Sequence, residues 1–502
     1  MTVGELLPRL SGLASADAPA LWQRAQDHVV TAIAYDSRQV ERGAIFVAVQ
    51  GQHFDGARFA PDAVTRGAVL VVAASDGPDD AGVPWLMVSD VRVALAELSA
   101  AFYGDPSAQL TVVGVTGTNG KTTTTYLLAA IFDAAGWPCG RIGSVGYSTG
   151  HRDHAAAHTT PEAPEVQALL REMVEHGCTA CAMEVSSHAL SMRRADETRF
   201  AAAVFSNLTR DHLDYHVDME DYFATKRRLF DMLGPGAPAI VNLDDPYGVR
   251  LAATLDHALT YAIDAPADVT PTSLTMTLSG SSMEVRTPRG SLHVRSRLPG
   301  RLNAYNMLAA VSAAVSVGVP LTAIEQGVAQ LHGVPGRFEI VSTTDDDLTV
   351  LVDFAHTDDA LRAVLTAVRD LSPRRVVTVF GCGGDRDAAK RPLMGAVAAR
   401  LSDIVVVTSD NPRSEDPDAI IAEIRLGMAP TADAEPGCHV SIVDRAAAIA
   451  HAVERAEPGD VVVIAGKGHE THQIVGEERR PFDDRVVARA ALSRRRAGTG
   501  WS

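Results

Sequence analysis

The chain has 502 residues, of which 46% are apolar and 21% charged. This length exceeds what one hydrophobic core usually covers, so we expect two to four domains. The 45 basic and 62 acidic residues give a net charge of -17, which argues against nucleic acid or anionic lipid as a partner. An anionic ligand must be held by local basic groups and backbone N–H donors, so a small phosphorylated substrate is favoured.

The first hundred residues alternate strand-like runs at 45–49, 68–72 and 85–89 with helical segments, which predicts a small α/β domain. The N-terminus lacks a basic region followed by an apolar block, so we expect no secretory signal. The cysteines number five and form no even framework, which predicts a cytoplasmic protein. Cys178 and Cys181 have the spacing of a redox or half-zinc site, but without a second pair we interpret them as buried core residues.

The stretch TVVGVTGTNGKTTTTYLL (111–128) predicts a strand, an anion-binding loop and a helix N-terminus. It is a variant, because Val115 stands where the common phosphate-loop pattern has its first glycine. Lys121 would neutralise phosphate oxygens, and the Thr122 hydroxyl would bind Mg²⁺. The alternative is a Gly/Thr-rich turn that only joins a strand to a helix.

From 111 to about 335, apolar runs separated by helical segments predict a mainly parallel, helix-covered sheet. Residues 275–299 alternate like a β-meander and are expected to form an antiparallel edge of that sheet. The apolar stretch 302–324 is interrupted by polar residues and predicts a soluble helix rather than a membrane span. After 333–339 a third set of strands follows, each with a polar loop where ligands are expected.

Two further segments have residues suited to metal binding. Glu184 stands at the tip of the apolar strand CAMEV and is a candidate magnesium ligand, although a solvated turn carboxylate is the alternative. In 206–230, His212 is a candidate metal ligand and Lys226 a candidate for modification or for a phosphate contact. A surface loop followed by a charged helix explains that segment equally well.

Polar residues in later segments form a weaker set. Asn303 and Asn306 lie three residues apart on one predicted helical face, which suits an adenine edge or simple capping. Arg337 follows a turn, and Asp353 and His356 come at a predicted strand end. Each signal is weak alone, and together they form a set.

GTNGKTT, EVSSHAL, NLTRDHLDYH, a lysine before LF, GRFE and DFAHT occur in the order found in the Mur ligases, which the chain resembles over nearly its whole length. These are cytoplasmic ATP-dependent amide ligases of peptidoglycan synthesis, and GTNGKT is the family's own form of the phosphate loop. The resemblance implies three α/β domains. They are a small UDP-sugar-binding domain (1–107), a central ATP-binding domain with a P-loop-type, mainly parallel sheet and helices on both faces (108–335), and a Rossmann-like amino-acid-binding domain (336–502).

The implied reaction phosphorylates the γ-carboxylate of D-glutamate in UDP-N-acetylmuramoyl-L-alanyl-D-glutamate, and the amine of the third amino acid then attacks the acyl phosphate. The implied magnesium ligands are Thr122 and Glu184 for one ion and His212 and Lys226 for the other, with Lys226 carbamylated to N6-carboxylysine. Together with Lys121 they are the implied catalytic residues. The implied ATP-binding residues are Gly117, Thr118, Asn119, Gly120, Lys121, Thr122, Thr123, Asn303, Asn306, Arg337, Asp353 and His356. The implied nucleotide-sugar contacts are Ser37, His53, Thr159, Thr160, Ser186 and Arg194.

The C-terminal loops GCGGDRDAAKRP, SDNPRSEDP and AGKGHE bear on the amino acid added. Meso-diaminopimelate carries a second carboxylate beside its distal amine, and two arginines suit that carboxylate while Glu470 suits the ammonium. The expected contacts are Arg386, Asp410, Asn411, Pro412, Arg413, Gly466 and Glu470. DNPR also resembles the family's diaminopimelate-type motif.

The alternatives are that Arg413 only caps a turn, that the acceptor is L-lysine, that the chain is a folylpolyglutamate synthase-like ligase, or that it is a non-catalytic nucleotide-gated binding protein. The full N-terminal domain with DSRQV argues against the folylpolyglutamate reading. We expect a monomer that acts on small-molecule substrates, without nucleic acid and without membrane insertion.

Overall fold

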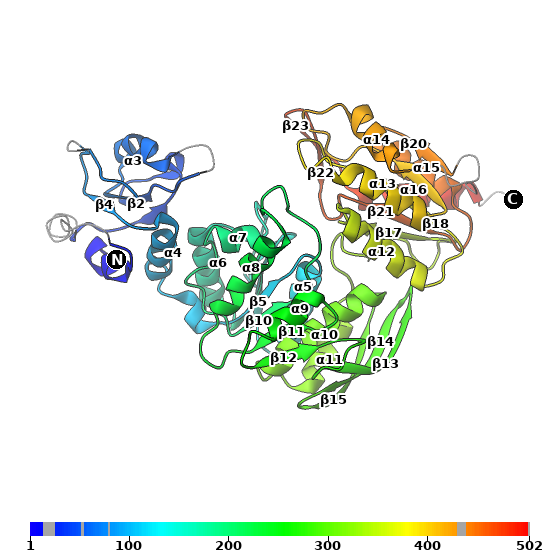
Figure 1. Ribbon diagram of the computed structural model, residues 1–502, viewed down its shortest axis with the longest axis horizontal. Coiled ribbons are helices and arrows are strands. Elements are labelled where there is room, and N and C mark those ends of the chain that lie inside the picture. Colours follow the sequence, from blue (N-terminus) through cyan, green and yellow to red (C-terminus); the bar gives the residue numbers. More distant parts are fainter. Residues whose placement is uncertain (14–25, 52–54, 79–80, 429–437, 500–502) are drawn as a thin grey trace. The chain divides into compact units, whose positions relative to one another are not determined.

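The structure is a computed structural model, and it describes residues 1–13, 26–51, 55–78, 81–428 and 438–499 (Figure 1). The described residues divide into two compact units whose segments alternate along the chain. Unit 1 comprises Met1–Thr116, Gly136–Phe205 and Phe223–Ile240, and unit 2 comprises Gly117–Ala135, Ser206–Tyr222 and Val241–Ser502.

The N-terminal part of unit 1 is a four-stranded parallel sheet. Its strands, in spatial order, are β1 (Ala32–Ala34), β2 (Ala44–Val47), β3 (Leu70–Ala73) and β4 (Trp85–Met87). Successive β2 side chains point to opposite faces, as the period of a strand requires. Ile45 and Val47 join the core that includes α4 (Val91–Phe102), whereas Phe46 joins the core that includes α3 (Ala60–Arg66). The sheet is therefore covered on both faces.

The segment 111–261 forms an eight-stranded sheet in the order β12-β11-β10-β5-β9-β6-β7-β8. The strands are β5 (Thr111–Thr116), β6 (Cys139–Gly143), β7 (Gly146–Ser148), β8 (Asp153–His154), β9 (Ala180–Glu184), β10 (Ala202–Phe205), β11 (Ala239–Asn242) and β12 (Ala258–Tyr261). β5 lies between β9 and β10 and is parallel to both, so their carboxyl ends share one edge. Cys181 lies in β9 and Cys178 two residues before that strand, and both cysteines are buried, as expected.

Helices follow most strands of this region. They are α5 (Lys121–Ala134), α6 (Ala163–Glu175), α7 (Ser187–Ser191), α8 (Met219–Asp231), α9 (Pro246–Ala252), α10 (Arg301–Ser316) and α11 (Leu321–Gln330). The apolar stretch 302–324 thus spans most of α10 and the beginning of α11. In unit 2, α5 packs against α10 and α11, and a Cβ at Gly327 would lie 2.4 Å from the Cα of Ile131.

The meander at 275–299 forms a sheet of its own, so the prediction of an edge on the central sheet was wrong. Its antiparallel strands are β13 (Thr270–Thr277), β14 (Gly280–Thr287) and β15 (Gly290–Ser296). The alternation gives these strands one apolar face, on which Met283, Leu292 and Val294 are buried. β15 packs against α11, so a helix covers the sheet instead of another strand pairing with it.

The C-terminal part of unit 2 is a six-stranded sheet in the order β16-β17-β21-β18-β19-β20. The strands are β16 (Glu339–Ile340), β17 (Thr349–Asp353), β18 (Val376–Phe380), β19 (Ile404–Val407), β20 (His439–Ser441) and β21 (Val461–Ala465), and only β16 is antiparallel to its neighbour. One core includes α12 (Asp358–Asp370), α13 (Lys390–Leu401) and α14 (Pro417–Leu426), and another includes α15 (Arg445–Arg455) and α16 (Asp484–Thr499). The β22 (His472–Val475) and β23 (Glu478–Pro481) hairpin precedes α16.

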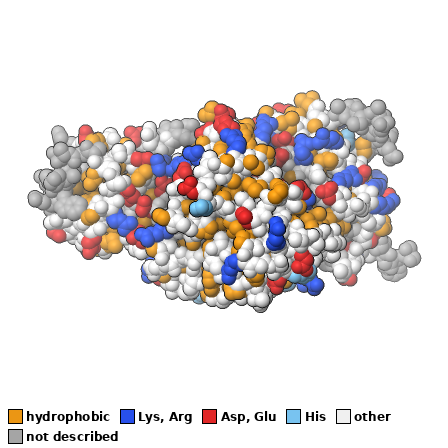
Figure 2. Space-filling model, turned by 60° about the horizontal axis from the view of Figure 1, so that its bottom comes forward, with side chains coloured by type: hydrophobic (Ala, Val, Ile, Leu, Met, Phe, Trp, Pro, Cys, Tyr) orange, Lys and Arg blue, Asp and Glu red, His pale blue; other side chains and the backbone are white. Residues whose placement is uncertain are grey.

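Basic and acidic side chains are interspersed on the face that Figure 2 shows, without a large area of one sign. Such a surface gives no general field for a polyanion. Across the described ranges, none of the helices combines the length and the apolar character needed to cross a bilayer.

Candidate active site

The phosphate loop between β5 and α5 depends on two glycines. Gly117 and Gly120 have φ values of +139° and +89°, a region that favours glycine. A Cβ at Gly117 would lie 2.0 Å from Ser206 Oγ, and one at Gly120 would lie 2.3 Å from Asn306 Oδ1. The loop therefore needs glycine at these positions rather than at Val115, which accounts for its variant pattern.

The segment after β10 holds this loop. Asn207 Oδ1 accepts a hydrogen bond from the Asn119 N–H at 2.9 Å, and Asn207 Nδ2 donates to the Asn119 carbonyl at 3.1 Å. The Lys121 ammonium donates to the carbonyls of Gly117 and Thr118, both at 2.9 Å, which keeps it over the loop. The first N–H groups of α5 lack intrahelical partners. Ammonium and backbone donors together suit a polyphosphate.

Glu184 ends β9 directly beside the strand that leads into the phosphate loop. It pairs in register with Val115 of β5 and is 1% exposed. Its Oε1 accepts from the N–H of Ser144 at 3.0 Å, while within the described part of the chain Oε2 has no hydrogen-bond donor. A buried carboxylate with an open oxygen requires a cation or a donor. Carboxylate and hydroxyl oxygens suit Mg²⁺, so the chemistry of Glu184, and separately that of the buried Thr122 hydroxyl on α5, fits their prediction as ligands.

Asp211, next to the predicted ligand His212, was not assigned a role from the sequence. Burial alone would raise the pKa of Asp211, but His212, His356 and Lys121 outweigh it and lower the pKa. His212 has φ +54°, a left-handed conformation, and its Nε2 lies 3.3 Å from Asp211 Oδ2. An ionised Asp211 therefore connects the loop electrostatically with the nucleotide-site residues. The signal that was available is its place between a basic residue and a histidine.

Lys226 lies on α8 and is 1% exposed. A cation buried this deeply must be compensated or chemically altered. Among the described residues, no group of three or more His, Cys, Asp or Glu side chains is arranged to hold a metal ion. The predicted magnesium ligands include a threonine and a modified lysine, so they form a different kind of donor set.

Asn303 and Asn306 lie together on α10, and both are buried. Asn306 Nδ2 donates to Asn303 Oδ1 at 3.2 Å, and Asn303 Nδ2 donates to the Pro299 carbonyl at 2.9 Å. Asn306 Oδ1 lies against Gly120, as the short approach to a Cβ there shows. The pair is therefore next to the phosphate loop, and contact with adenine stays a prediction.

Phe354 joins three predicted ATP-site residues at the end of β17. The Arg337 Cζ lies 4.4 Å from the centroid of its ring, and the His356 ring is 4.5 Å away. Arg337 also donates to Thr122 Oγ1 at 3.3 Å. Burial raises the pKa of Asp353, against the pull of Arg337, and burial lowers the pKa of His356. The structure thus brings Arg337, Asp353 and His356 together.

Three of the six predicted nucleotide-sugar contacts meet at the end of β9. Thr160 Oγ1 donates to the Glu184 carbonyl at 2.8 Å and accepts from the Ser186 N–H at 3.2 Å. Arg194 donates to the Thr160 carbonyl at 3.2 Å and forms an ion pair with Glu162 at 2.8 Å. Hydroxyl groups and a guanidinium are thereby fixed in one place.

The other three predicted contacts are placed less closely. Ser37 is buried in the N-terminal part, and the nearby Tyr35 donates to Glu165 on α6 at 2.9 Å. Thr159 is half-buried and precedes the fixed Thr160 in the chain. His53 lies outside the described residues.

Arg386 and Arg413, the two arginines predicted to contact the added amino acid, flank one loop. A Cβ at Gly383 would lie 3.0 Å from Arg413 Nη1 and 4.0 Å from Arg386 Cγ. Burial and the charge of Arg386 lower the pKa of Arg413. Arg413 Nη1 donates to the Gly384 carbonyl at 2.7 Å, and a Cβ at Gly384 would lie 1.9 Å from the Pro412 carbonyl oxygen. Two neighbouring guanidinium groups favour a carboxylate ligand.

The remaining residues predicted to contact the added amino acid form a hydrogen-bonded group. Asn411 Nδ2 donates to Glu470 Oε2 at 3.0 Å. Gly466 has φ +117°, and a Cβ there would lie 2.8 Å from Asp410 Oδ2. The buried Lys467 donates to both Asn411 and Glu470. Lys467 is not among the residues predicted from the sequence, although it is a lysine in the turn after an apolar strand.

A buried ion pair connects the strand ends that carry this group. Arg445 donates to both carboxylate oxygens of Asp484 at 2.7 Å, and both side chains are fully buried. The same guanidinium donates to the carbonyls of Ser409 and Ala465, which immediately precede Asp410 and Gly466 in the chain. No motif in the sequence marks this pair.

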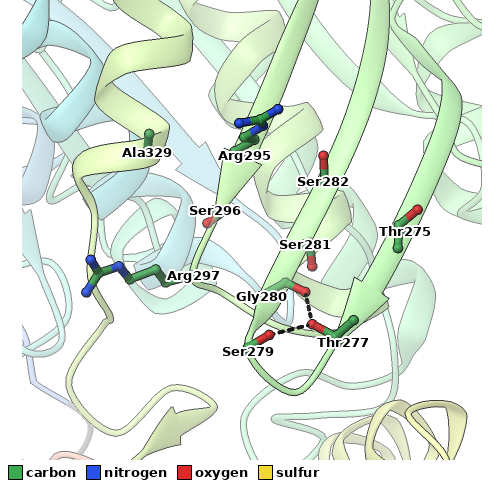
Figure 3. A pocket seen from close by; sticks show the side chains of 10 residues that line it. All are labelled: Thr275, Thr277, Ser279, Gly280, Ser281, Ser282, Arg295, Ser296, Arg297 and Ala329. Atoms are coloured by element: carbon green, nitrogen blue, oxygen red, sulfur yellow. Dashed lines mark hydrogen bonds between the residues drawn. The ribbon is translucent and has the colours of Figure 1, made fainter.

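A cavity of about 350 Å³ opens on the meander sheet (Figure 3). It is lined by hydroxyl side chains of β13 and β14 and by the exposed Arg295 and Arg297. It contains none of the residues predicted for the nucleotide, the sugar or the acceptor. This cavity is therefore not part of the candidate active site.

The chain matches the Mur ligase middle domain over residues 115–314, the Mur ligase glutamate ligase domain over 336–468, and the catalytic domain of the Mur ligase family over 29–103. It belongs to the Mur ligase family, whose members are ATP-dependent amide ligases with three α/β domains. The three matches follow one another along the chain and together span most of residues 29–468.

The chain is 46% identical over 502 residues to the UDP-N-acetylmuramoyl-L-alanyl-D-glutamate–2,6-diaminopimelate ligase of Gloeobacter violaceus, with 99% of each chain covered. It is also 46% identical over 475 residues to the ligase of the same name from Geobacter metallireducens, covering 91% of this chain and 93% of that one. A solved structure of a ligase with this name has a TM-score of 0.69 at 34% identity, covering 98% of this chain and 99% of the other. MurF ligase from Thermotoga maritima, solved in complex with ADP, shares the fold with a TM-score of 0.63 at 17% identity, covering 95% of this chain and 100% of the other.

Proposed function

We propose that this chain is an ATP-dependent ligase that adds meso-diaminopimelate to the D-glutamate γ-carboxylate of UDP-N-acetylmuramoyl-L-alanyl-D-glutamate, a step of peptidoglycan precursor synthesis. The observation that carries the choice of the added amino acid is that Arg386 and Arg413 both lie beside Gly383, while Glu470 is hydrogen-bonded to Asn411, two residues before Arg413. Only an acceptor with a distal carboxylate and a distal ammonium uses all three. The full-length relatives of that name support the same choice.

The reaction activates a carboxylate, which is a poor electrophile. A γ-carboxylate oxygen of D-glutamate attacks the γ-phosphorus of ATP, and ADP leaves. The acceptor amine then attacks the carbonyl carbon of the acyl phosphate, loses a proton, and expels phosphate as the amide forms. Lys121 and the first N–H groups of α5 would hold the phosphates in place, and this fixed positive potential lowers the barrier without reorganisation.

Thr122 and Glu184 would hold one magnesium ion, and His212 with carbamylated Lys226 would hold a second. When bound, Mg²⁺ would supply positive charge to the phosphoryl oxygens. The backbone N–H of Ser144 fixes one carboxylate oxygen of Glu184, which leaves the other available. The ATP site would be completed by Asn303, Asn306, Arg337, Asp353 and His356.

We assign the nucleotide sugar to Thr160, Ser186 and Arg194, which are already hydrogen-bonded to one another, together with Ser37, His53 and Thr159. The proposed domains are residues 1–107 for the nucleotide sugar, 108–335 for ATP and 336–502 for the added amino acid. We expect the protein to work in the cytoplasm as a monomer on small-molecule substrates.

The deciding experiment measures ADP release and product mass with UDP-N-acetylmuramoyl-L-alanyl-D-glutamate, comparing meso-diaminopimelate with L-lysine. Turnover with diaminopimelate and not with lysine is expected, because lysine leaves the arginines without a partner. Turnover with lysine alone would keep the family and overturn the acceptor. No turnover with either acceptor would favour a nucleotide-gated binding protein.

A further inference from the structure

Lysine is rare in this chain, and three of its four lysines are residues of the candidate site. Of the 45 basic residues only four are lysines, namely Lys121, Lys226, Lys390 and Lys467. Lys121 lies on the phosphate loop and Lys226 is a proposed magnesium ligand. Although nearly all basic residues of the chain are arginines, the turn that contains Gly466 has a lysine, Lys467.

Lys467 follows β21 and is fully buried. Its Nζ donates to Asn411 Oδ1 at 3.0 Å and to Glu470 Oε2 at 2.7 Å. A compact ammonium can serve two acceptors this close together, whereas the planar fork of a guanidinium needs more room. Removing a charge from water is unfavourable unless it is paired, so Lys467 and Glu470 hold each other in place.

These contacts determine how Asn411 is oriented. Its Oδ1 accepts from Lys467 and from the Ile474 N–H at 2.9 Å, and its Nδ2 donates to Glu470 at 3.0 Å. If the amide were turned over, its NH₂ group would face two donors. Lys467 thus fixes the direction in which Asn411 presents its amide.

The same contacts leave one oxygen of Glu470 for a ligand. Oε2 accepts from both Lys467 and Asn411, whereas within the described ranges no donor bonds to Oε1. The Glu470 side chain is 27% exposed, so this carboxylate reaches the surface of the loop while the lysine behind it does not. The geometry gives Glu470 a buried oxygen anchored by the protein and an open oxygen that can accept from a cation.

We propose that Lys467 is a positioning residue for the acceptor amino acid: it anchors Glu470 and Asn411 so that Glu470 Oε1 receives the distal ammonium of the acceptor. This inference rests on the proposed function, because it takes diaminopimelate as the acceptor. It assigns discrimination at the distal amine to Lys467 and Glu470, and discrimination at the distal carboxylate to Arg386 and Arg413.

The test compares Lys467→Met with the wild type on three acceptors. Meso-diaminopimelate has both distal groups, 2-aminopimelate lacks the distal amine, and L-lysine lacks the distal carboxylate. Lys467→Met should raise the KM for diaminopimelate at least about tenfold, the factor lost with one charge-assisted hydrogen bond. The KM for 2-aminopimelate, ATP and the nucleotide sugar should stay within about threefold. The preference of the enzyme for diaminopimelate over 2-aminopimelate should therefore fall about tenfold. Its preference for diaminopimelate over lysine should stay nearly constant, because lysine shares the distal amine.

The ratio of acceptors separates positioning from folding. A purely structural role would lower the active fraction and the melting temperature, reduce turnover of every acceptor alike, and leave the ratio unchanged, which would overturn the proposal. If Lys467 acts through Glu470, the Lys467→Met/Glu470→Gln double variant should prefer diaminopimelate over 2-aminopimelate as strongly as Glu470→Gln alone does. If the two substitutions reduced this preference additively, the proposal would be contradicted.

Calorimetric titration of the three acceptors into protein loaded with the nucleotide sugar and a non-hydrolysable ATP analogue gives the same comparison without turnover. Wild-type protein that binds diaminopimelate without making product would refute the proposed function, yet the binding ratios would still decide the role of Lys467. Wild-type protein that shows no preference for diaminopimelate over 2-aminopimelate would refute the role of Lys467 even with full turnover.

Discussion

Replacing Arg413 with alanine should change the choice of acceptor more than any other single substitution in the C-terminal loops. Arg413 and Arg386 flank Gly383, and neither forms an ion pair within the described ranges. The charge of Arg386, together with burial, lowers the pKa of Arg413, as expected for two cations placed close together. A distal carboxylate relieves that repulsion, and an acceptor without one does not.

The expected loss follows from the hydrogen bonds that the guanidinium makes to a carboxylate. Each charge-assisted bond is worth about 1.5–3 kcal/mol, so a bidentate contact corresponds to about 3–6 kcal/mol. Alanine also removes the repulsion with Arg386, which favours the lower end of that range. At about 1.4 kcal/mol for each factor of ten, kcat/KM for diaminopimelate should fall roughly 100-fold. The value for L-lysine should change little.

The assay measures kcat/KM for both acceptors with Arg413→Ala and with Arg425→Ala as the matched control. Arg425 is exposed on α14, so its loss should leave both acceptors unchanged. Arg413 also donates to the Gly384 carbonyl, and melting temperatures therefore accompany the kinetics. An equal fall for diaminopimelate and lysine would refute the reasoning, because it would mean that Arg413 supports the loop rather than reads the distal carboxylate.

Gly120→Ala should raise the KM for ATP at least about tenfold, because a left-handed non-glycine residue costs about 1–2 kcal/mol and the new Cβ would lie 2.3 Å from Asn306 Oδ1; an unchanged KM would show that the loop adapts. Burial raises the pKa of Cys382 to about 12, so at pH 8 a thiol reagent should label the half-buried Cys438 and reach Cys382 only after unfolding. The neutral thiol of Cys382 stabilises the fold below about pH 8.5, the pH at which this thiol ionises in the unfolded chain. That contribution is lost as the pH rises toward 12. Rapid labelling of both Cys382 and Cys438 in the native protein would contradict this prediction. If Lys226 is carbamylated, removing dissolved carbon dioxide should lower activity and bicarbonate should restore it, whereas Lys226→Met should be inactive with or without bicarbonate.

The candidate site could be predicted from the sequence where chemistry follows directly on a strand. Glu184, Asp353 and Gly466 each stand at or just beyond the carboxyl end of a buried apolar run, and parallel strands bring such ends to one edge. The phosphate loop was equally readable, since its glycines at 117 and 120 occupy positions that only glycine tolerates.

Strand order and tertiary partners could not be predicted in the same way. The alternation at 275–299 indicates an antiparallel meander but does not identify what covers its apolar face, and the structure supplies α11 instead of a neighbouring strand. Likewise, nothing local places β21 between β17 and β18, although that order brings Gly466 beside Asp410. Asp211 and Lys467 were missed because some of their partners, His356 and Lys121 for the first and Asn411 for the second, are far away in the sequence.

The pair of Arg445 and Asp484 shows why such partners matter. A buried ion pair contributes little net stability, because removing two charges from water roughly offsets their attraction. Here, however, the guanidinium has donors left for the carbonyls of Ser409 and Ala465. Ala465 ends β21 and Ser409 lies two residues beyond β19, and the residues that follow them are Gly466 and Asp410. The pair therefore sets the spacing of two acceptor loops rather than adding to the stability of the sheet. Removing one partner should both lower the melting temperature, because it leaves the other charge buried and unpaired, and impair binding of the added amino acid.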